Sequence, residues 1–143
     1  MIIVLSPAKT LDFETPAVTA NFSQPSHLPH DLRYDRADEF MQVVHGLWGS
    51  WADDALLQDK KNNRFADPDK VRALDHEGKF FRSRGPLPVP RSPQGSPVII
   101  QAGQSGRGRE FAARWGEVIF TTLSTLEAAK KNYAAIKAAV RMP

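Results

Sequence analysis

The sequence contains no cysteine, and this excludes disulfide bonds and metal sites built on thiolates. It also lacks a long hydrophobic run, because the apolar stretch Ile2–Leu5 ends at Ser6-Pro7 and no basic residue precedes it. Such a stretch is too short for a signal peptide or a membrane span. The four histidines show no spacing typical of a metal site. We therefore predict a soluble, cytoplasmic protein with no membrane partner and no bound metal.

A strong excess of charge of one sign is missing as well. Lys and Arg number 19 and Asp and Glu number 16, so the formal net charge is only +3. This charge is too small and too scattered for a nucleic-acid surface, and a nucleic-acid partner is not expected. With 143 residues, of which 41% are hydrophobic, the chain is long enough for one small domain with a core.

The first half of the chain offers one strand and one helix. Ile2–Leu5 is a continuous apolar run bounded by a Ser-Pro turn, which predicts a buried strand. Residues 12–33 contain three prolines and no steady period, which predicts a loop. Asp35 is then expected to cap a helix. Its apolar face is predicted from the residues that recur at three and four positions, which are Ala37, Phe40, Val44, Leu47 and Trp51.

A long segment from about Asp53 to Ser96 has no periodic pattern. It contains the polar stretch "DKKNNRFADPDK" and several prolines in "RGPLPVPRSPQGSP". An irregular connection of this length is unusual inside a compact domain, and it predicts either a functional excursion or a disordered segment. Within it, "KFFRSRG" is expected to add a short strand or the arm of a hairpin.

Regular structure is predicted again from Pro97 onward. Residues 98–101 and 117–122 have strand patterns, and residues 106–115 have a helical one. Ser124 and Glu127 match a capping box, which predicts a helix running to about Val140. Its apolar face is expected to hold Leu126, Ala129, Tyr133, Ile136 and Val140. The order strand, helix, strand, helix predicts parallel strands in an α/β fold, with Ile2–Leu5 in the same sheet.

The turn in "VIIQAGQSGRGREF" is the strongest candidate site. In a parallel α/β unit, the loop after a strand lies at the carboxyl edge of the sheet, where ligands bind. Backbone N–H groups at the start of a helix favour an anion there, Gly103 allows a close approach, and Ser105 can donate a hydroxyl hydrogen bond. Arg107 and Arg109 lie nearby in the sequence. The same pattern also fits a plain tight turn, and no Walker motif follows.

Several stretches resemble one known family when they are read together. "HDLRYDRADEF", "DHEGKFFRSRGPLPVP" and "VIIQAGQSGRGREFAARWGEVIF" are similar in order and spacing to the luciferase-like flavin-dependent monooxygenases. Among these the sequence looks most like the nitrilotriacetate monooxygenase component A group, over residues 28–143. The resemblance implies a TIM barrel, reduced FMN supplied by a separate flavin reductase, dioxygen, and a small organic substrate. We therefore expect an α/β chain that forms a partial TIM-barrel (luciferase-like) fragment with a long irregular excursion.

The resemblance also implies which residues bind the cofactor. Gly103, Gln104 and Ser105 would hold the FMN phosphate, with Ser105 the strongest of the three. Gln104 departs from the smaller residue that is commoner in this turn. His30 and Tyr34 would lie near the flavin. No catalytic residue is predicted.

The N-terminus resembles a different family. "MIIVLSPAKTLDFETPAVTANFSQP" is similar to the start of the YaaA peroxide-stress proteins, whose "SPAKTLD" motif it contains. The resemblance suggests that Lys9 meets an anion, while a solvated lysine is the alternative. We therefore expect a YaaA-like segment at residues 1–27 joined to a luciferase-like monooxygenase fragment at residues 28–143.

A chimeric or truncated chain of this kind predicts weak or absent monooxygenase activity, since a complete barrel needs about 250 residues. The alternatives are a YaaA-like oxidative-stress protein and a non-catalytic folded fragment. A homo-oligomer that covers exposed strands is a further expectation.

Overall fold

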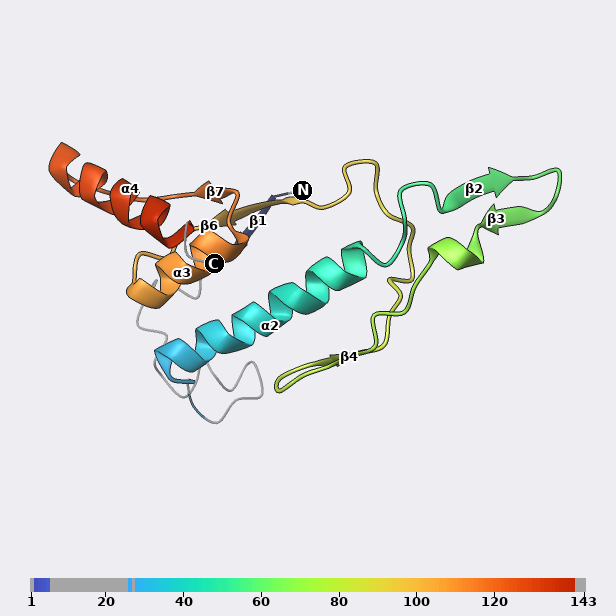
Figure 1. Ribbon diagram of the computed structural model, residues 1–143, viewed down its shortest axis with the longest axis horizontal. Coiled ribbons are helices and arrows are strands. Elements are labelled where there is room, and N and C mark those ends of the chain that lie inside the picture. Colours follow the sequence, from blue (N-terminus) through green and yellow to red (C-terminus); the bar gives the residue numbers. More distant parts are fainter. Residues whose placement is uncertain (1, 6–25, 27, 141–143) are drawn as a thin grey trace. The chain divides into compact units, whose positions relative to one another are not determined.

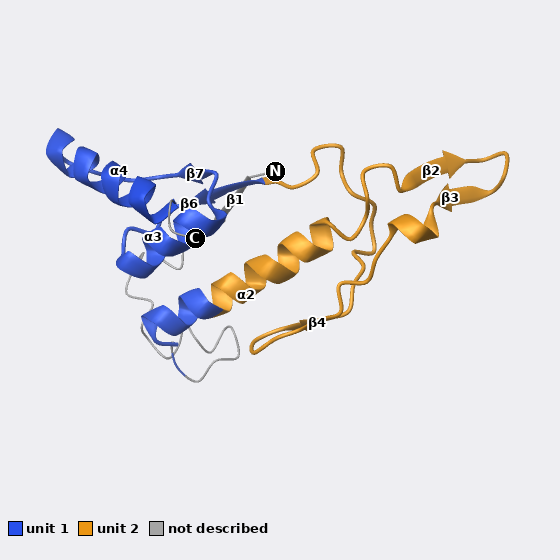
Figure 2. Cartoon of the chain, viewed as in Figure 1, with its two compact units in different colours: residues 1–35, 98–143 blue, residues 36–97 orange. Residues whose placement is uncertain are grey.

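The computed structural model describes residues 2–5, 26 and 28–140. The chain forms two compact units (Figures 1 and 2). Unit 1 comprises residues 1–35 and 98–143, and unit 2 comprises residues 36–97. Helix α2, which spans His30–Trp48, begins in unit 1 and continues into unit 2.

Unit 1 contains a parallel three-stranded sheet in the order β1-β6-β7. Strand β1 (Ile2–Leu5) pairs with β6 (Val98–Gln101), and β6 pairs with β7 (Val118–Ile119). The predicted strands at residues 2–5 and 98–101, and their parallel pairing, are confirmed. The α/β class is confirmed with them, since a helix connects β6 to β7 as parallel strands require.

Strand β7 is shorter than predicted. Residues 117–122 have a strand pattern, but regular pairing covers only Val118 and Ile119. One further bond, from the Phe120 N–H to the Gln101 carbonyl at 2.9 Å, closes the ladder. Strand β6 ends at Gln101, so residues beyond Phe120 have no strand to pair with in the described sheet. The strand pattern of residues 117–122 is therefore realised only in part, because β6 is too short to pair with all of it.

Helix α3 (Gly106–Trp115) has the predicted bounds, whereas the cap of α4 (Leu126–Val140) differs from the prediction. The predicted capping box of Ser124 and Glu127 is wrong. Thr125 caps the helix instead: its Oγ1 accepts from the Ala128 N–H at 3.2 Å. Because α4 begins one residue later than the capping box requires, Glu127 lies too early in the helix for that role, and it pairs with Lys130 at 3.3 Å.

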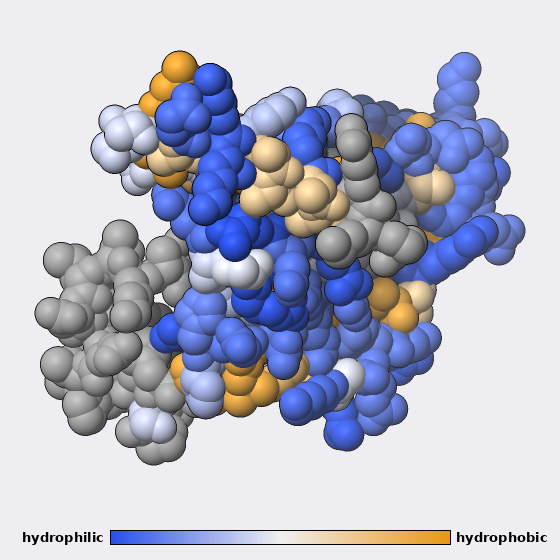
Figure 3. All heavy atoms as spheres, turned by 60° about the vertical axis from the view of Figure 1, so that its left-hand side comes forward, coloured by the Kyte–Doolittle hydropathy of each residue, from blue (hydrophilic) through white to orange (hydrophobic). Residues whose placement is uncertain are grey.

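The apolar face predicted for α4 is not buried in the described structure. Leu126, Tyr133 and Val140 are 68%, 65% and 55% exposed, although α4 packs against α3. Exposed apolar side chains also occur elsewhere, including Phe65 and Phe120. The face in Figure 3 accordingly shows separate hydrophobic patches among mostly hydrophilic residues. No helix in the described part of the chain is long and apolar enough to cross a membrane.

Helix α2 begins at His30, five residues before the predicted cap Asp35, so the prediction of Asp35 as its cap is wrong. The Arg33 N–H already donates to the Pro29 carbonyl at 3.0 Å. The predicted apolar face is also wrong at Phe40, which is 42% exposed, and at Trp51, which lies beyond the helix. The side chains that the helix does bury are Tyr34, Asp38, Glu39, Met41 and Val43. Because Asp38 and Glu39 are among the buried side chains, this face has no continuous apolar pattern in the sequence.

Unit 2 contains more regular structure than the predicted irregular excursion. Strands β2 (Leu56–Asp59) and β3 (Arg64–Ala66) form one antiparallel hairpin. Strands β4 (His76–Glu77) and β5 (Arg82–Ser83) form a second, which confirms the predicted short arm in "KFFRSRG". A single 3₁₀ turn lies at Pro68–Lys70. The hairpins are too short to have a clear alternating pattern in the sequence.

The carboxylate of Glu39 fastens the β4–β5 hairpin to helix α2. It accepts hydrogen bonds from the N–H groups of Phe80, at 2.9 Å, and Phe81, at 2.7 Å, and it lies 3.3 Å from His76 Nε2. Gly78 makes room for it, because a Cβ there would lie 2.2 Å from Glu39 Oε1. Burial raises the pKa of Glu39, but the two backbone donors and His76 outweigh burial, so its pKa is lowered from the ordinary 4.5.

The lowered pKa of Glu39 predicts how stability depends on pH. The Glu39 contribution is complete above the pKa of the unfolded chain and is lost as the pH falls through the lower folded value. Glu39→Gln should therefore lower the denaturation midpoint at neutral pH and reduce the further loss on acidification below about pH 4. Urea denaturation at several pH values measures both effects. The control is Glu77→Gln, since Glu77 is 74% exposed in its pair with Arg82. Equal behaviour of the two variants would contradict a special role for Glu39.

Candidate functional site

The candidate site is the turn between β6 and α3, at the carboxyl end of the central strand. Ser105 has an extended backbone and is the N-cap of α3, and its Oγ accepts from the Gly108 N–H at 2.9 Å. The first N–H groups of a helix have no partner within the helix, and the helix dipole makes this end positive. The turn therefore places backbone donors where an anion is favoured.

Two glycines, one in this turn and one in the first turn of α3, are required because other groups approach them closely. A Cβ on Gly103 would lie 2.4 Å from Gln101 Nε2 and 2.6 Å from the Tyr34 hydroxyl. A Cβ on Gly108 would lie 2.6 Å from the same hydroxyl and 3.0 Å from Ser105 Oγ. Tyr34 is only 2% exposed, so its ring cannot easily move away. The first turn of α3 thus rests on a tyrosine supplied by α2.

The first residue of α3, Gly106, has no such close neighbour. A Cβ on Gly106 would meet no heavy atom within 4 Å, among the residues that the structure describes. As far as the structure describes the chain, the space over the start of α3 is therefore open to a bound group. This arrangement of one closed and one open side fits a phosphate held against the helix start.

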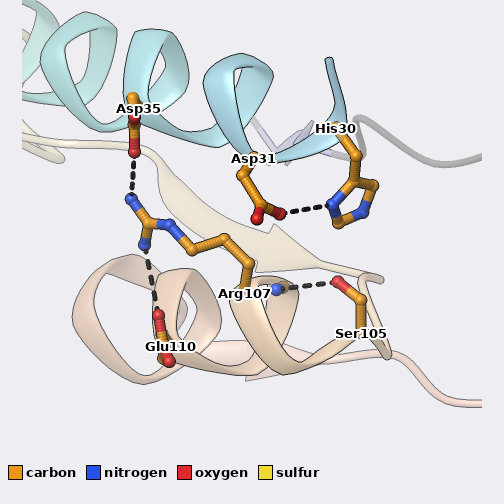
Figure 4. Close-up of polar contacts among 7 residues, drawn as sticks. His30, Asp31, Asp35, Ser105, Arg107 and Glu110 are labelled. Carbon is orange, nitrogen blue, oxygen red and sulfur yellow. Dashed lines mark hydrogen bonds and ion pairs between the residues drawn. The ribbon is translucent and has the colours of Figure 1, made fainter.

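The predicted residues His30 and Tyr34 lie together on the first turns of α2. Their ring centroids are 5.1 Å apart in an edge-to-face arrangement, and Tyr34 also packs against Phe111 at 5.7 Å. His30 Nδ1 lies 2.9 Å from the Asp31 carboxylate (Figure 4). His30 is exposed, while the Tyr34 hydroxyl lies against the turn. The structure thus connects both residues to the β6–α3 turn through Tyr34.

Gln104 and the two neighbouring arginines have other partners. The Gln104 side chain is exposed, and its backbone carbonyl accepts from Arg109 Nη1 at 2.8 Å. Arg107 lies between Asp35, at 2.8 Å, and Glu110, at 3.5 Å, as Figure 4 shows. Both guanidinium groups are therefore engaged within unit 1, and an anion at the turn would rely on backbone donors and Ser105.

Sequence reasoning missed Gln101, the last residue of β6. Its side chain has no exposed surface, and its Oε1 accepts from the Gly103 N–H at 2.7 Å. Its Nε2 has no hydrogen-bond partner among the described residues. Alternation along β6 places Gln101 on the same face as the buried Ile99, and this signal could have identified it.

A comparison with known proteins identifies the family. Residues 14–142 match the luciferase-like monooxygenase family. The chain belongs to this family. It is 54% identical over 124 residues to the dibenzothiophene-sulfone monooxygenase of Rhodococcus erythropolis, covering 87% of this chain and 27% of that protein. It is 48% identical over 117 residues to nitrilotriacetate monooxygenase component A of Aminobacter aminovorans, covering 82% of this chain and 26% of that protein.

Solved structures agree with the sequence relatives. A crystal structure of long-chain alkane monooxygenase (LadA) superposes with a TM-score of 0.84 at 43% identity, covering 90% of this chain and 30% of that one. The predicted partial TIM-barrel fold and the predicted family are confirmed. The chain spans about a quarter of the length of the curated relatives it matches. The family match begins at residue 14, inside the segment predicted to be YaaA-like, and the comparisons do not show a YaaA relationship.

The close approach at the turn yields a stability prediction. Gly103→Ala should destabilise unit 1 by about 1–3 kcal/mol, because the added methyl group overlaps Gln101 and Tyr34. Gly106→Ala is the matched control, since its methyl group enters open space and alanine suits a helix better than glycine. Urea denaturation of the two variants and the wild type compares them directly. Equal midpoints for Gly103→Ala and Gly106→Ala would show that the turn is not closely packed.

Proposed function

We propose that this chain binds FMN through its phosphate at the β6–α3 turn and serves in a flavin-dependent monooxygenase. The open helix start at Gly106, with Ser105 as its cap, is the observation that carries the proposal. Membership of the luciferase-like monooxygenase family supports it. When bound, reduced FMN supplies the chemistry that activates dioxygen, and the protein supplies binding, orientation and exclusion of water.

Ser105 is proposed as the side-chain ligand of the phosphate. A hydroxyl group offers one donor and two acceptors. Ser105 Oγ uses an acceptor for the Gly108 N–H, so its own hydrogen is left for a phosphate oxygen. Gly103 and Gln104 are proposed to contribute backbone positions rather than side chains. This division of roles explains how the exposed Gln104 can stand where a smaller residue is commoner.

His30 and Tyr34 are proposed to lie on the flavin side of the site. Tyr34 fixes the position of the turn through its contact with Gly103 and Gly108. His30 faces Asp31 through Nδ1, so Nε2 is the ring nitrogen directed elsewhere. We assign no catalytic residue, because the chain spans only about a quarter of its relatives.

A flavin reductase and a small organic substrate are the proposed partners of the protein. The name of one relative, nitrilotriacetate monooxygenase component A, indicates an enzyme of more than one component. We propose that a separate flavin reductase supplies reduced FMN, and that the substrate is a small organic molecule. Oxygenation would require this site within a complete flavin-binding barrel.

The YaaA-like segment at residues 1–27 and the junction near residue 28 also stay proposals. They rest on the "SPAKTLD" motif and on Lys9, which lie outside the described residues. Strand β1 pairs with β6, so residues 2–5 would share the sheet of the monooxygenase segment. The YaaA-like and non-catalytic alternatives both predict no preference for a flavin phosphate.

The phosphate site predicts a difference between two flavins. FMN should bind more tightly than riboflavin, which lacks the phosphate. Ser105→Ala should weaken FMN binding by about 1.5–3 kcal/mol, or roughly tenfold to a hundredfold, because a hydroxyl donor to a charged group is lost. Fluorescence titration of both flavins with both proteins measures the effect.

A second variant separates this role of Ser105 from its role as a helix cap. Ser105→Asp keeps a good N-cap and should leave stability unchanged, but its charge should repel the phosphate. Equal binding of FMN and riboflavin by the wild type would contradict the proposed function.

A further inference from the structure

Gln101 is a buried polar residue that packing alone does not explain. It has no exposed surface, and its Nε2 has no partner among the described residues. A buried donor without a partner costs free energy. An apolar residue would fill this end of β6 without that cost, as Ile99 does two positions earlier on the same face. The buried amide of Gln101 therefore indicates a role at the β6–α3 turn other than packing.

Both ends of the Gln101 amide lie at Gly103. Oε1 accepts from the Gly103 N–H at 2.7 Å, and this bond fixes the direction of the backbone as the chain leaves β6. Nε2 lies 2.4 Å from the point where a Gly103 Cβ would be, and the Tyr34 hydroxyl lies 2.6 Å from the same point. The positive end of the amide dipole is thus buried directly beside the turn that leads into α3.

We propose that Gln101 is a positioning residue of the anion site at the β6–α3 turn. Its Oε1 holds the Gly103 N–H in place, and its unpartnered NH₂ group adds positive potential beside the helix start. Because Gln101 is fully buried, it acts on a bound phosphate through Gly103 and through its electric field, without contact. This inference rests on the proposed binding of FMN.

The substitution Gln101→Glu tests the field of the amide with little change in shape. A carboxylate still accepts from the Gly103 N–H, but it replaces the positive end of the amide with negative charge. Burial and the nearby phosphate both raise the pKa of such a carboxyl group. FMN affinity should therefore be close to that of the wild type where the new group is protonated, and weaker by roughly tenfold or more where it is ionised.

The measurement is a fluorescence titration with FMN and with riboflavin at a series of pH values from about 5 to 8. The ratio of wild-type to Gln101→Glu affinity for FMN should rise with pH, while the same ratio for riboflavin stays flat. Taking the ratio removes the titration of the FMN phosphate itself, whose second pKa is about 6. Gln42→Glu, on the exposed side of α2, is the control for added charge and should match the wild type.

A second variant tests the same role of Gln101 in case the Gln101→Glu protein does not fold. Gln101→Met removes both ends of the amide without adding charge and should reduce the preference for FMN over riboflavin at every pH. If the wild type prefers FMN and neither variant changes that preference, the role of Gln101 is overturned while the proposed function stands. If the wild type binds the two flavins equally, the phosphate site and the role of Gln101 are both overturned.

Discussion

The approach of the Tyr34 hydroxyl to two glycines is the constraint on which the site depends. Gly103 and Gly108 leave no room for a side chain, since a Cβ on either would lie 2.6 Å from that hydroxyl. Tyr34 is in turn held by Phe111 and has almost no exposed surface. The end of β6, the start of α3 and the first turns of α2 are therefore fixed by one small group of contacts within unit 1.

This constraint makes the helix start a suitable place for a charged group. Ser105 caps α3, Gln101 holds the Gly103 N–H, and no described residue fills the space over Gly106. The nearby arginines are paired with carboxylates or with a backbone carbonyl, so they add little to the local attraction for an anion. Backbone dipoles and one hydroxyl group, held in place before a ligand arrives, lose little entropy on binding. The β6–α3 turn can thus attract an anion without a cluster of positive side chains.

Much of unit 1 could be predicted from the sequence because its signals are local. The apolar run of β6 is bounded by Pro97 and Gly103, and Ser105 with Gly106 marks the start of α3. The start of α2 was missed because an aspartate inside the helix resembled a cap, although Pro29 just before His30 is itself a start signal. Gln101 was missed because its side chain is polar, although alternation along β6 places it on the same buried face as Ile99. The β2–β3 hairpin of unit 2 was missed, because its strands are too short to have a clear alternating pattern. Only one arm of the β4–β5 hairpin was predicted, because a buried carboxylate, Glu39, and not a pattern of apolar residues, fixes that hairpin.

The central claim is that the backbone of the β6–α3 turn binds the flavin phosphate, and amide NMR tests it most directly. A ¹⁵N-labelled sample titrated with FMN should show its largest amide shifts at residues 103–108, where the backbone donors and the helix cap lie. Titration with riboflavin should leave these amides nearly unchanged. Shifts confined to other parts of the chain, such as the β2–β3 hairpin, or equal shifts with both flavins, would contradict the account.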